Sequence, residues 1–385
     1  MNRLAIVSTH PIQYNAPLFQ LLAANDIVSI KVFYTWGESV LSNKFDPGFG
    51  KNIEWDIPLL QGYDYSFVKN ISPAPGSHSY KGIDNPSLVS SIENWGASAV
   101  LVYGWNFKSH LYCLRYFHKK IPVLFRGDST LTDKQPFLKN IARKFVLSRV
   151  YRNIDIALYT GTKNKEYFKA FGLKENQLVF APHAVQNERF AKTDNAHDNF
   201  TRQTKKDLSI QENETVVVFS GKFQQKKDPQ LLLKVFKHLN YKHSHLVFVG
   251  DGELTTALKA AAQGFTNIHF LPFQNQSLMP AVYRLGDIFC LPSKGPGETW
   301  GLAVNEAMAS GRAIIASDKT GCAVDLVKDN INGFVFKAGD EEALREILTK
   351  MLSDKKKVLQ MGDASKEIIK DWSLSKTANA IINIV

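Results

Sequence analysis

Short runs of β-branched and aromatic residues alternate with longer segments of helical period along the chain. Such runs, bounded by turn residues, are typical of strands buried on both faces, and helices between them indicate a parallel sheet. The predicted strands are 4–8, 28–34, 99–103, 123–125 and 156–159 in the first half, and 215–220, 245–249, 268–270, 288–291, 313–316 and 334–336 in the second. The predicted helices are 16–24, 86–95, 108–119, 136–152, 229–239, 254–263, 278–284, 302–310 and 341–352. Because the rhythm occurs twice, we expect an α/β protein with two doubly wound, Rossmann-like domains facing each other across a cleft.

Two segments interrupt this rhythm. Residues 191–214 are polar and almost without apolar periodicity, which favours a linker and divides the chain into domains 1–190 and 191–371. A final helical stretch, 372–385, is expected to pack back on the first domain. Residues 37–82 form a long insertion rich in glycine, proline and aromatic residues, and loops of that size are usually functional.

Length, charge and cysteine content narrow the class of protein. The 385 residues suit two or three domains, and a net charge of +11 favours an anionic partner such as nucleotide phosphates, nucleic acid or an anionic membrane. The three cysteines lack metal-site spacing and are expected to be small core residues, so neither a disulfide framework nor a structural zinc site is predicted. No signal-peptide core or membrane span is apparent, so we expect a cytoplasmic protein, soluble or peripheral on the inner face of the membrane.

Residues 297–311 carry the most informative motif. Glu298 precedes a predicted helix and Glu306 lies inside it, so the two carboxylates can contact different parts of one ligand. Amides near Gly301 and Leu302, at the start of the helix, favour a phosphate. The alternative is that Glu298 lies in the first helical turn, where it suits the helix dipole, and that Glu306 is solvated. The small and apolar neighbours of Glu306 argue against a solvated face.

A second motif, 219–229, follows the first predicted strand of the second domain. Gly221 and Lys222 come directly after this strand, and Lys222 and Lys227 are suited to neutralise a departing diphosphate. The alternative is a solvated basic loop before a helix that Asp228 caps and Pro229 begins. That alternative explains Asp228 and Pro229 but not Gly221 and Lys222.

Together with the segment 182–190 and the turn 317–321, these motifs resemble the family 4 retaining glycosyltransferases, which have the GT-B fold. The resemblance covers the second domain and, more loosely, the first. It implies that Glu298 contacts the transferred sugar, that Glu306 holds the ribose, and that Lys222 and Lys227 stabilise the leaving diphosphate. Lys222 stands where the family usually has arginine, so the charge is kept and the bidentate fork is lost. The implied donor site also includes Gly221, the amides of Thr299, Trp300, Gly301 and Leu302, and Phe273 beside the base.

The first domain departs from the family pattern. His10 to Asn15 replaces the usual glycine pair, and Arg126 to Ser129 stands where many members have a histidine. Candidate contacts to the acceptor or to phosphate are His10, Tyr14, His110, Arg126 and Asp128. For Arg126 and Asp128 a local ion pair or turn cap is an equal alternative, and for the histidines a structural role. Aromatic residues of the insertion either shape an acceptor site or cap the domain: Phe45, Phe49, Trp55, Tyr63, Tyr65 and Phe67.

Residues 134–152 form a predicted basic amphipathic helix without an acidic residue. Its cations are Lys134, Lys139, Arg143, Lys144, Arg149 and Arg152. Such a helix suits docking on an anionic lipid surface. The alternative is an ordinary domain helix whose apolar side covers the sheet.

The leading hypothesis is a retaining transferase that moves a sugar from a UDP- or GDP-linked donor to a saccharide or lipid-linked glycan, with no metal or other cofactor. A GT-B epimerase or hydrolase is the alternative enzyme, and would consume donor without acceptor. A nucleic-acid-binding protein is disfavoured, because the basic residues lack interleaved aromatics.

Overall fold

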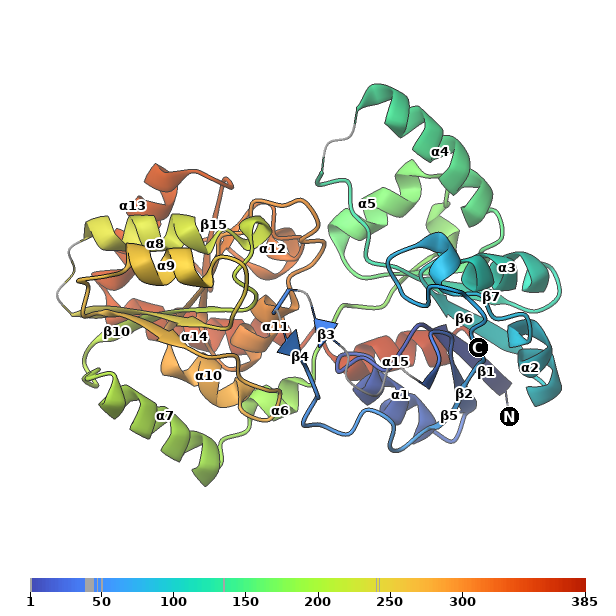
Figure 1. Ribbon diagram of the computed structural model, residues 1–385, viewed down its shortest axis with the longest axis horizontal. Helices are drawn as coiled ribbons and strands as arrows, with labels where there is room; N and C mark the ends of the chain where they lie inside the picture. The colour runs from blue at the N-terminus through green and yellow to red at the C-terminus, as the bar shows by residue number, and fades with distance from the viewer. Residues whose placement is uncertain are drawn as a thin grey trace. The chain divides into compact units, whose positions relative to one another are not determined.

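The computed structural model describes residues 2–38, 45–46, 48–49, 51–133, 136–239, 241 and 243–385. It divides into two compact units, and the chain, coloured by residue number in Figure 1, passes between them more than once. The first unit comprises Met1–Lys44, Ile57–His183 and Leu374–Val385, and the second comprises Phe45–Asp56 and Ala184–Ser373. The sequence predicts the domain boundary between residues 190 and 191. In the structure the chain passes from the first unit to the second between residues 183 and 184, and part of the insertion belongs to the second unit.

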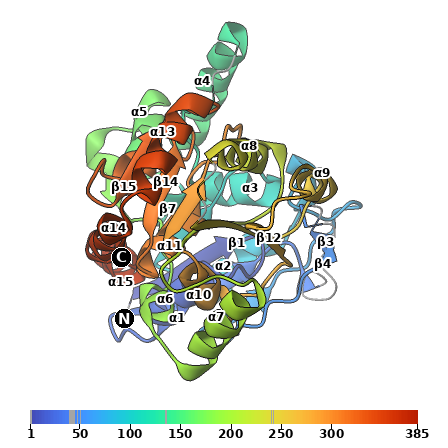
Figure 2. The ribbon, with the colours of Figure 1, turned by 90° about the vertical axis from the view of Figure 1, so that its left-hand side faces the viewer.

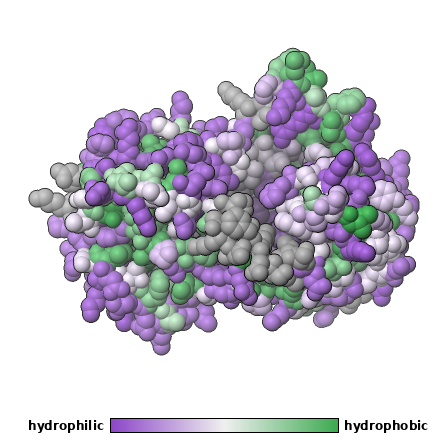
Figure 3. Space-filling view, in the orientation of Figure 1, coloured by the Kyte–Doolittle hydropathy of each residue, from purple (hydrophilic) through white to green (hydrophobic). Residues whose placement is uncertain are grey.

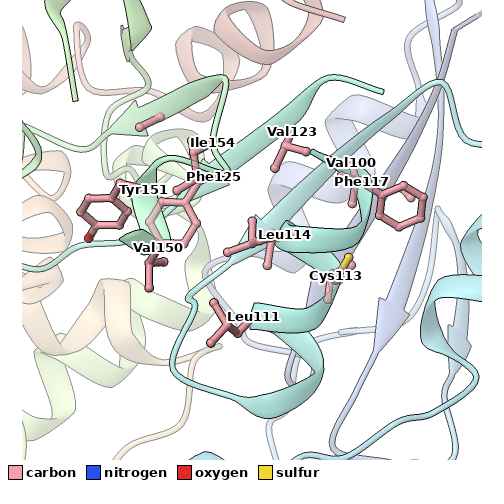
Figure 4. Packing of buried hydrophobic residues seen from close by; sticks show 14 of the residues in the cluster. Val100, Leu111, Cys113, Leu114, Phe117, Val123, Phe125, Val150, Tyr151 and Ile154 are labelled. Carbon is pink, nitrogen blue, oxygen red and sulfur yellow. The ribbon is translucent and has the colours of Figure 1, made fainter. Parts of the chain in front are cut away.

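The first unit is built on a seven-stranded sheet of order β5-β2-β1-β6-β7-β8-β9, in which all neighbouring strands are parallel. The strands are β1 (Asn2–Ser8), β2 (Val28–Tyr34), β5 (Asp64–Phe67), β6 (Ala99–Tyr103), β7 (Val123–Arg126), β8 (Ile156–Tyr159) and β9 (Leu178–Phe180). The helices are α1 (Ala16–Ala23), α2 (Leu88–Trp95), α3 (Lys108–Phe117), α4 (Phe137–Tyr151), α5 (Thr162–Ala170) and α15 (Leu374–Ile382), with short 3-10 turns at Tyr80–Gly82 and Glu175–Gln177. Helices α3, α4 and α5 pack over β6 and β7, and Figure 4 shows Leu114, Phe125 and Tyr151 in the core that they form.

The second unit repeats the design with a six-stranded parallel sheet of order β12-β11-β10-β13-β14-β15. The strands are β10 (Thr215–Ser220), β11 (Ser244–Val249), β12 (Ile268–Leu271), β13 (Ile288–Leu291), β14 (Ala313–Ser317) and β15 (Gly333–Phe336), beside a small antiparallel pair, β3 (Phe45–Asp46) and β4 (Lys51–Asn52). The helices are α6 (Asn187–Ala191), α7 (Asn195–Asp207), α8 (Pro229–Leu239), α9 (Thr255–Ala261), α10 (Met279–Leu285), α11 (Leu302–Ala309), α12 (Ala323–Leu326), α13 (Glu341–Leu352) and α14 (Lys355–Ile369), with a 3-10 turn at Gln225–Lys227. Both sheets have the strand order of doubly wound domains, and this order confirms the predicted fold class.

All eleven predicted strands and nine predicted helices are present with small shifts at their ends. The prediction missed β5 and β9, which are short edge strands of mostly half-buried residues: β5 alternates polar and aromatic residues, and the apolar run of β9 is only three residues long. It also missed the helices α5, α6, α12 and α14 and the two-residue strands β3 and β4. The cysteines are buried, as expected.

The predicted linker 191–214 is wrong, because residues Asn195–Asp207 form α7. This helix has no buried residue, so it leaves no apolar period in the sequence. Polar contacts hold it instead: the Asp194 side chain accepts the amide of His197 at its N-terminus, and Thr201 Oγ1 donates to the carbonyl of Ala281 in α10.

Candidate functional site

An ion pair lies at the carboxyl edge of the second unit's sheet. Lys227 Nζ is 2.9 Å from Glu298 Oε2, and their side chains are 15% and 9% exposed. Ser293 Oγ lies 3.5 Å from the same carboxylate oxygen. The two partners are 71 residues apart, but they follow β10 and β13, which are neighbours in the sheet. Ligands of open parallel sheets bind at this edge, so the topology places a lysine and a carboxylate where a ligand is expected.

The loop that carries Glu298 is held by the turn after β14. The amide of Gly321 donates to the carbonyl of Glu298 at 3.1 Å, and the amide of Cys322 donates to that of Trp300 at 2.9 Å. A Cβ atom at residue 321 would lie 1.7 Å from the Thr299 carbonyl oxygen, so only glycine allows this approach. The turn 317–321 is thus the support of the Glu298 loop, a function that its sequence does not reveal.

Gly221 lies beside the ion pair, and Lys222 lies beside Phe49, one of a group of aromatic rings. Gly221 has φ +144°, and a Cβ atom there would be 3.6 Å from Lys227 Cδ, so this glycine faces the lysine stem. Lys222 Nζ is 5.0 Å from the centre of the Phe49 ring, which in turn is 4.7 Å from that of Phe273. Trp55 also packs against Phe273, at 6.5 Å.

These contacts divide the aromatic residues of the insertion. Phe49 and Trp55 belong to the second unit, whereas Tyr63, Tyr65 and Phe67 pack with Tyr34 at the sheet edge of the first. The side chain of Phe45 lies outside the described residues. The single insertion predicted from sequence is therefore two structural parts, and Phe49, the aromatic neighbour of Lys222, comes from it.

Glu306 is buried in α11, with 2% of its surface exposed, and Glu306 Oε2 accepts a hydrogen bond of 2.6 Å from Tyr283 Oη. The alternative of a solvated Glu306 is therefore wrong. Helix α11 begins at Leu302, after Gly301 at φ +94°, so Glu298 does not lie in its first turn either. The ring of Trp300 is structural, since Nε1 donates to Asn305 Oδ1 at 2.8 Å and the ring packs on Trp372. Thr299 and Leu302 are half-buried in the same segment.

His110 and Arg126 of the first unit are occupied by their own domain. His110 is fully buried; Nε2 lies 2.8 Å from Thr35 Oγ1, and Nδ1 lies 3.0 Å from the Tyr103 carbonyl oxygen. Burial lowers the pKa of His110 to about 4. The Arg126 guanidinium, 6% exposed, donates to the carbonyls of Ala181 and Pro182 at 2.9 and 3.0 Å. Burial lowers the pKa of Arg126, while Tyr103 and Asp128 oppose that shift.

The other candidates of the first unit lie nearer its surface. His10 Nδ1 lies 2.9 Å from Thr9 Oγ1, and its ring meets the Trp36 ring edge-on at 5.2 Å. Tyr14 is half-buried just before α1. Asp128 is exposed after β7 and lines a cavity of about 330 Å³ at the carboxyl ends of β6 and β7. Trp105, Phe125, Ser129, Arg143 and Val146 also line this cavity, which sequence reasoning did not predict.

Among the residues that the structure describes, no three His, Cys, Asp or Glu side chains gather in a way that could hold a metal ion. No helix built from the described residues has the length and hydropathy needed to cross a membrane. Lys134, one of the predicted membrane-facing cations, lies outside the described residues.

Residues 200–368, most of the second unit, match the family model described as Glycosyl transferases group 1. With two Rossmann-like units on parallel sheets, the fold is that of the GT-B glycosyltransferases, which the solved structures most similar to this chain share. The chain therefore has the GT-B fold, and a segment of its second unit, less than half of the chain, matches the group 1 glycosyltransferases.

The proteins to which this chain is similar are named for different sugars and acceptors. The chain is 28% identical over 239 residues to the sulfoquinovosyl transferase SQD2 of Arabidopsis thaliana, covering 60% of this chain and 45% of that protein. It is 27% identical over 215 residues, 53% of each chain, to an Escherichia coli α-1,3-galactosyltransferase named for UDP-Gal and GlcNAc-diphosphoundecaprenol. HepE of Anabaena, solved with UDP, superposes with a TM-score of 0.74 at 14% identity, covering 100% and 99% of the two chains. The chain spans about half the length of the curated relatives it matches.

Proposed function

We propose that the protein transfers a sugar from a nucleotide-diphosphate sugar to an acceptor, with retention of the anomeric configuration. The observation that carries the proposal is the largely buried Lys227–Glu298 pair at the carboxyl edge of the second unit's sheet. A cation there stabilises the negative charge that develops on a departing diphosphate, and the carboxylate accepts hydrogen bonds from the sugar hydroxyls. The match of residues 200–368 to the group 1 family supports this assignment.

The donor roles are assigned within the second unit. Lys227 and Lys222, which is five residues earlier in the chain, neutralise the diphosphate. Glu298 positions the sugar, and Glu306 holds the ribose. Tyr283, which donates to Glu306 Oε2, fixes the orientation of that carboxylate. Amides of the segment 299–302 hold the diphosphate, and the aromatic group of Phe49 and Phe273 borders the base. UDP is the favoured nucleotide, because two of the similar proteins are named for UDP or UDP-Gal.

The acceptor is assigned to the first unit, and we propose a saccharide or a lipid-linked glycan. The names of SQD2 and of the galactosyltransferase that acts on a diphosphoundecaprenol-linked sugar support a glycolipid or polysaccharide pathway. The same reasoning, with the basic segment 134–152, supports contact with an anionic membrane surface and an inner-face location.

We propose further that the transfer needs no metal, because the lysines supply the positive charge. Transfer rates in buffer with EDTA and with added Mg²⁺ should agree. A loss of turnover in EDTA that Mg²⁺ restores would contradict the metal-free mechanism.

The central experiment measures donor binding and product together. A panel of nucleotide sugars is screened for thermal stabilisation, since a donor that binds the folded state raises the melting temperature by mass action. The stabilising donor is then incubated with and without a lipid-extract acceptor, and NMR reads the anomeric configuration of the product. Retention in a new glycosidic bond supports the proposal, while donor consumption without acceptor would indicate an epimerase or a hydrolase instead.

A further inference from the structure

Residues 45–56 come from the first half of the chain but belong to the second unit. The chain leaves the first unit after residue 44 and returns to it at residue 57. We call residues 45–56 the strap. In Figures 1 and 2 its strands β3 and β4 are blue, whereas the rest of the second unit runs from green to red. The strap therefore adds N-terminal residues to a unit that is otherwise built from residues 184–373.

Hydrogen bonds attach the C-terminal part of the strap to the loop between β12 and α10. Asp56 Oδ1 accepts from the amide of Ser277 at 3.0 Å, and Asp56 Oδ2 accepts from the hydroxyl group of the same residue. The carbonyl of Glu54 accepts from Asn275 Nδ2 at 2.6 Å. Because these bonds use particular atoms of two nearby loop residues, they fix the position of the strap along the loop.

The loop that receives the strap is itself fixed within the second unit. Arg189 donates to the carbonyl of Gln276 at 2.6 Å and to Gln276 Oε1 at 2.9 Å, and Gln276 is buried. Phe273, in the same loop, packs against Phe49 and Trp55 of the strap, with ring centres 4.7 and 6.5 Å away. Polar contacts near residue 56 and aromatic contacts from residue 49 onward therefore hold the strap in place.

The turn at Gly48 and Phe49 holds the side chain of Lys222. Gly48 is buried, and a Cβ atom at this position would lie 2.5 Å from Lys222 Cδ and 2.9 Å from Lys222 Cε. The lysine stem therefore lies directly against the glycine backbone, where an added methyl group would push it aside. Lys222 Nζ then lies 5.0 Å from the centre of the Phe49 ring, within the range of a cation–π contact. The strap thus supports both the stem and the ammonium group of Lys222.

Lys222 and Lys227 differ in what holds them. Lys227 Nζ is paired with Glu298 Oε2 at 2.9 Å, so a carboxylate fixes its position. Lys222 comes two residues after β10, where the backbone fixes only the start of its stem. A lysine stem is flexible, and its ammonium group lacks the preorganised planar fork of an arginine. A lysine at position 222 therefore gains most from a support for the far end of its stem.

We infer that the strap is a positioning element of the donor site, in which Gly48 and Phe49 hold the Lys222 ammonium group ready for the diphosphate. The inference rests on the proposed function and deepens it by naming residues outside the segment 200–368 that set the affinity for the diphosphate. Gly48 and Phe49 act through Lys222, so they are positioning residues. A support that is in place before the donor binds lowers the ordering cost of binding.

Lysine labelling tests the support of Lys222. Figure 3 shows a largely hydrophilic surface, and an exposed lysine such as Lys370, with 68% of its side chain exposed, supplies the reference rate. Reductive methylation, measured by mass spectrometry, should modify Lys222 more slowly than Lys370 in the wild type. The Lys222 rate should rise several-fold in Gly48→Ala and in Phe49→Leu, because each substitution removes one of its supports. Equal rates for Lys222 and Lys370 in the wild type would overturn the support.

Two substitutions of the same kind serve as controls. Gly76→Ala changes a buried glycine of the first unit where the nearest neighbour of a Cβ atom would be 3.8 Å away. Phe265→Leu removes a ring that lies 4.9 Å from Lys237 Nζ, a contact like that of Phe49 with Lys222 but not among the residues assigned to the donor. Both controls should leave the Lys222 rate unchanged. A strap variant whose Lys222 rate matches that of its control would contradict the support.

Nucleotide binding tests the consequence for the donor. Titration calorimetry compares UDP with uridine and GDP with guanosine, and the ratio of affinities in the better-bound pair measures the contribution of the diphosphate. Lys222→Met should lower this ratio about tenfold, because it removes a charge that contacts phosphate. Gly48→Ala and Phe49→Leu should lower it about threefold each. Since the ratio cancels contacts with the base, a purely structural role of the strap beside the base would not change it.

A double-mutant cycle decides whether the strap acts through Lys222. In the Lys222→Met background, Gly48→Ala and Phe49→Leu should leave the ratio unchanged, because the side chain that they position is gone. Circular dichroism verifies the fold of each variant. A ratio that the strap substitutions lower equally in both backgrounds, or in neither, would overturn the inference.

The same titrations separate this inference from the proposed function. If the wild type binds UDP or GDP more tightly than the nucleoside and the strap variants retain the full ratio, only the inference fails. If the wild type binds neither nucleotide, the proposed function fails, and the inference that rests on it fails too.

Discussion

The two units share one architecture but use the residues at the ends of their strands differently. In the second unit, residues after β10 and β13 meet as the Lys227–Glu298 pair at the sheet edge. In the first unit, Arg126 at the end of β7 donates to two backbone carbonyls, and His110 is buried against Thr35 and the Tyr103 carbonyl. A polar residue at the end of a strand is therefore a candidate for ligand binding or catalysis only when its polar groups are not already used to support its own domain.

The largest effect should come from the pair itself. Lys227→Met or Glu298→Gln should lower kcat/KM for transfer by about 10²–10³-fold, because each removes one preorganised charge from the proposed site of diphosphate departure. Steady-state kinetics would measure the loss, and circular dichroism would verify the fold. Lys226→Met, in the same turn, is the matched control and should retain nearly full turnover. Near-normal rates in both site variants would remove the contrast between the units.

Arg126→Met should instead reduce stability. It removes the side-chain donor of the buried Ala181 carbonyl and one of the two side-chain donors of the Pro182 carbonyl, which keeps Thr377 Oγ1, and we expect a loss of about 2 kcal/mol in the free energy of unfolding. Urea unfolding of the wild type and the variant would measure the difference. If Arg126 contacts phosphate rather than supporting its domain, the variant would keep its unfolding midpoint and lose turnover.

The protonation of His110 should make the first unit sensitive to acid. Its pKa is lowered to about 4 in the folded state from the ordinary 6.5, so the unfolded state binds more protons between these values and stability falls with falling pH. The contribution of His110 is complete above pH 6.5, and about 2 kcal/mol of it should be lost by pH 5. Unfolding curves at the two pH values should show a smaller difference for His110→Gln than for the wild type. An identical pH dependence in both would contradict this assignment.

The smallest effect should come from Glu306. Glu306→Gln keeps an oxygen that can accept from Tyr283 but loses the charge, and should weaken donor binding about tenfold while kcat changes little. Titration calorimetry with the donor would measure it. Tyr283→Phe, which leaves the carboxylate intact and removes its positioning hydrogen bond, should weaken binding less. A larger loss for Tyr283→Phe than for Glu306→Gln would show that the hydroxyl, not the carboxylate, faces the donor.

The sequence predicted the strands well because the central strands of both sheets are buried on two faces and read as unbroken apolar runs. It failed at α7, whose stability comes from a cap and from contacts to α10 rather than from a buried face. In the site, Glu298 and Lys227 were identified from their motifs. The support of the Glu298 loop by Gly321, and the placing of Phe49 against Phe273, depend on contacts between distant parts of the chain and leave no local signal.

Helix α15 bears on the order in which the protein folds during synthesis. It belongs to the first unit, where it packs on α1 and where Thr377 Oγ1 donates to the carbonyl of Pro182 at 2.8 Å. Domains usually fold in the order in which they leave the ribosome. Here the unit that is synthesised first lacks one of its helices until residues 374–382 emerge, after the whole second unit has been made. The N-terminal unit therefore completes its fold last, and during translation the surface of α1 that α15 covers stays open to solvent and to chaperones.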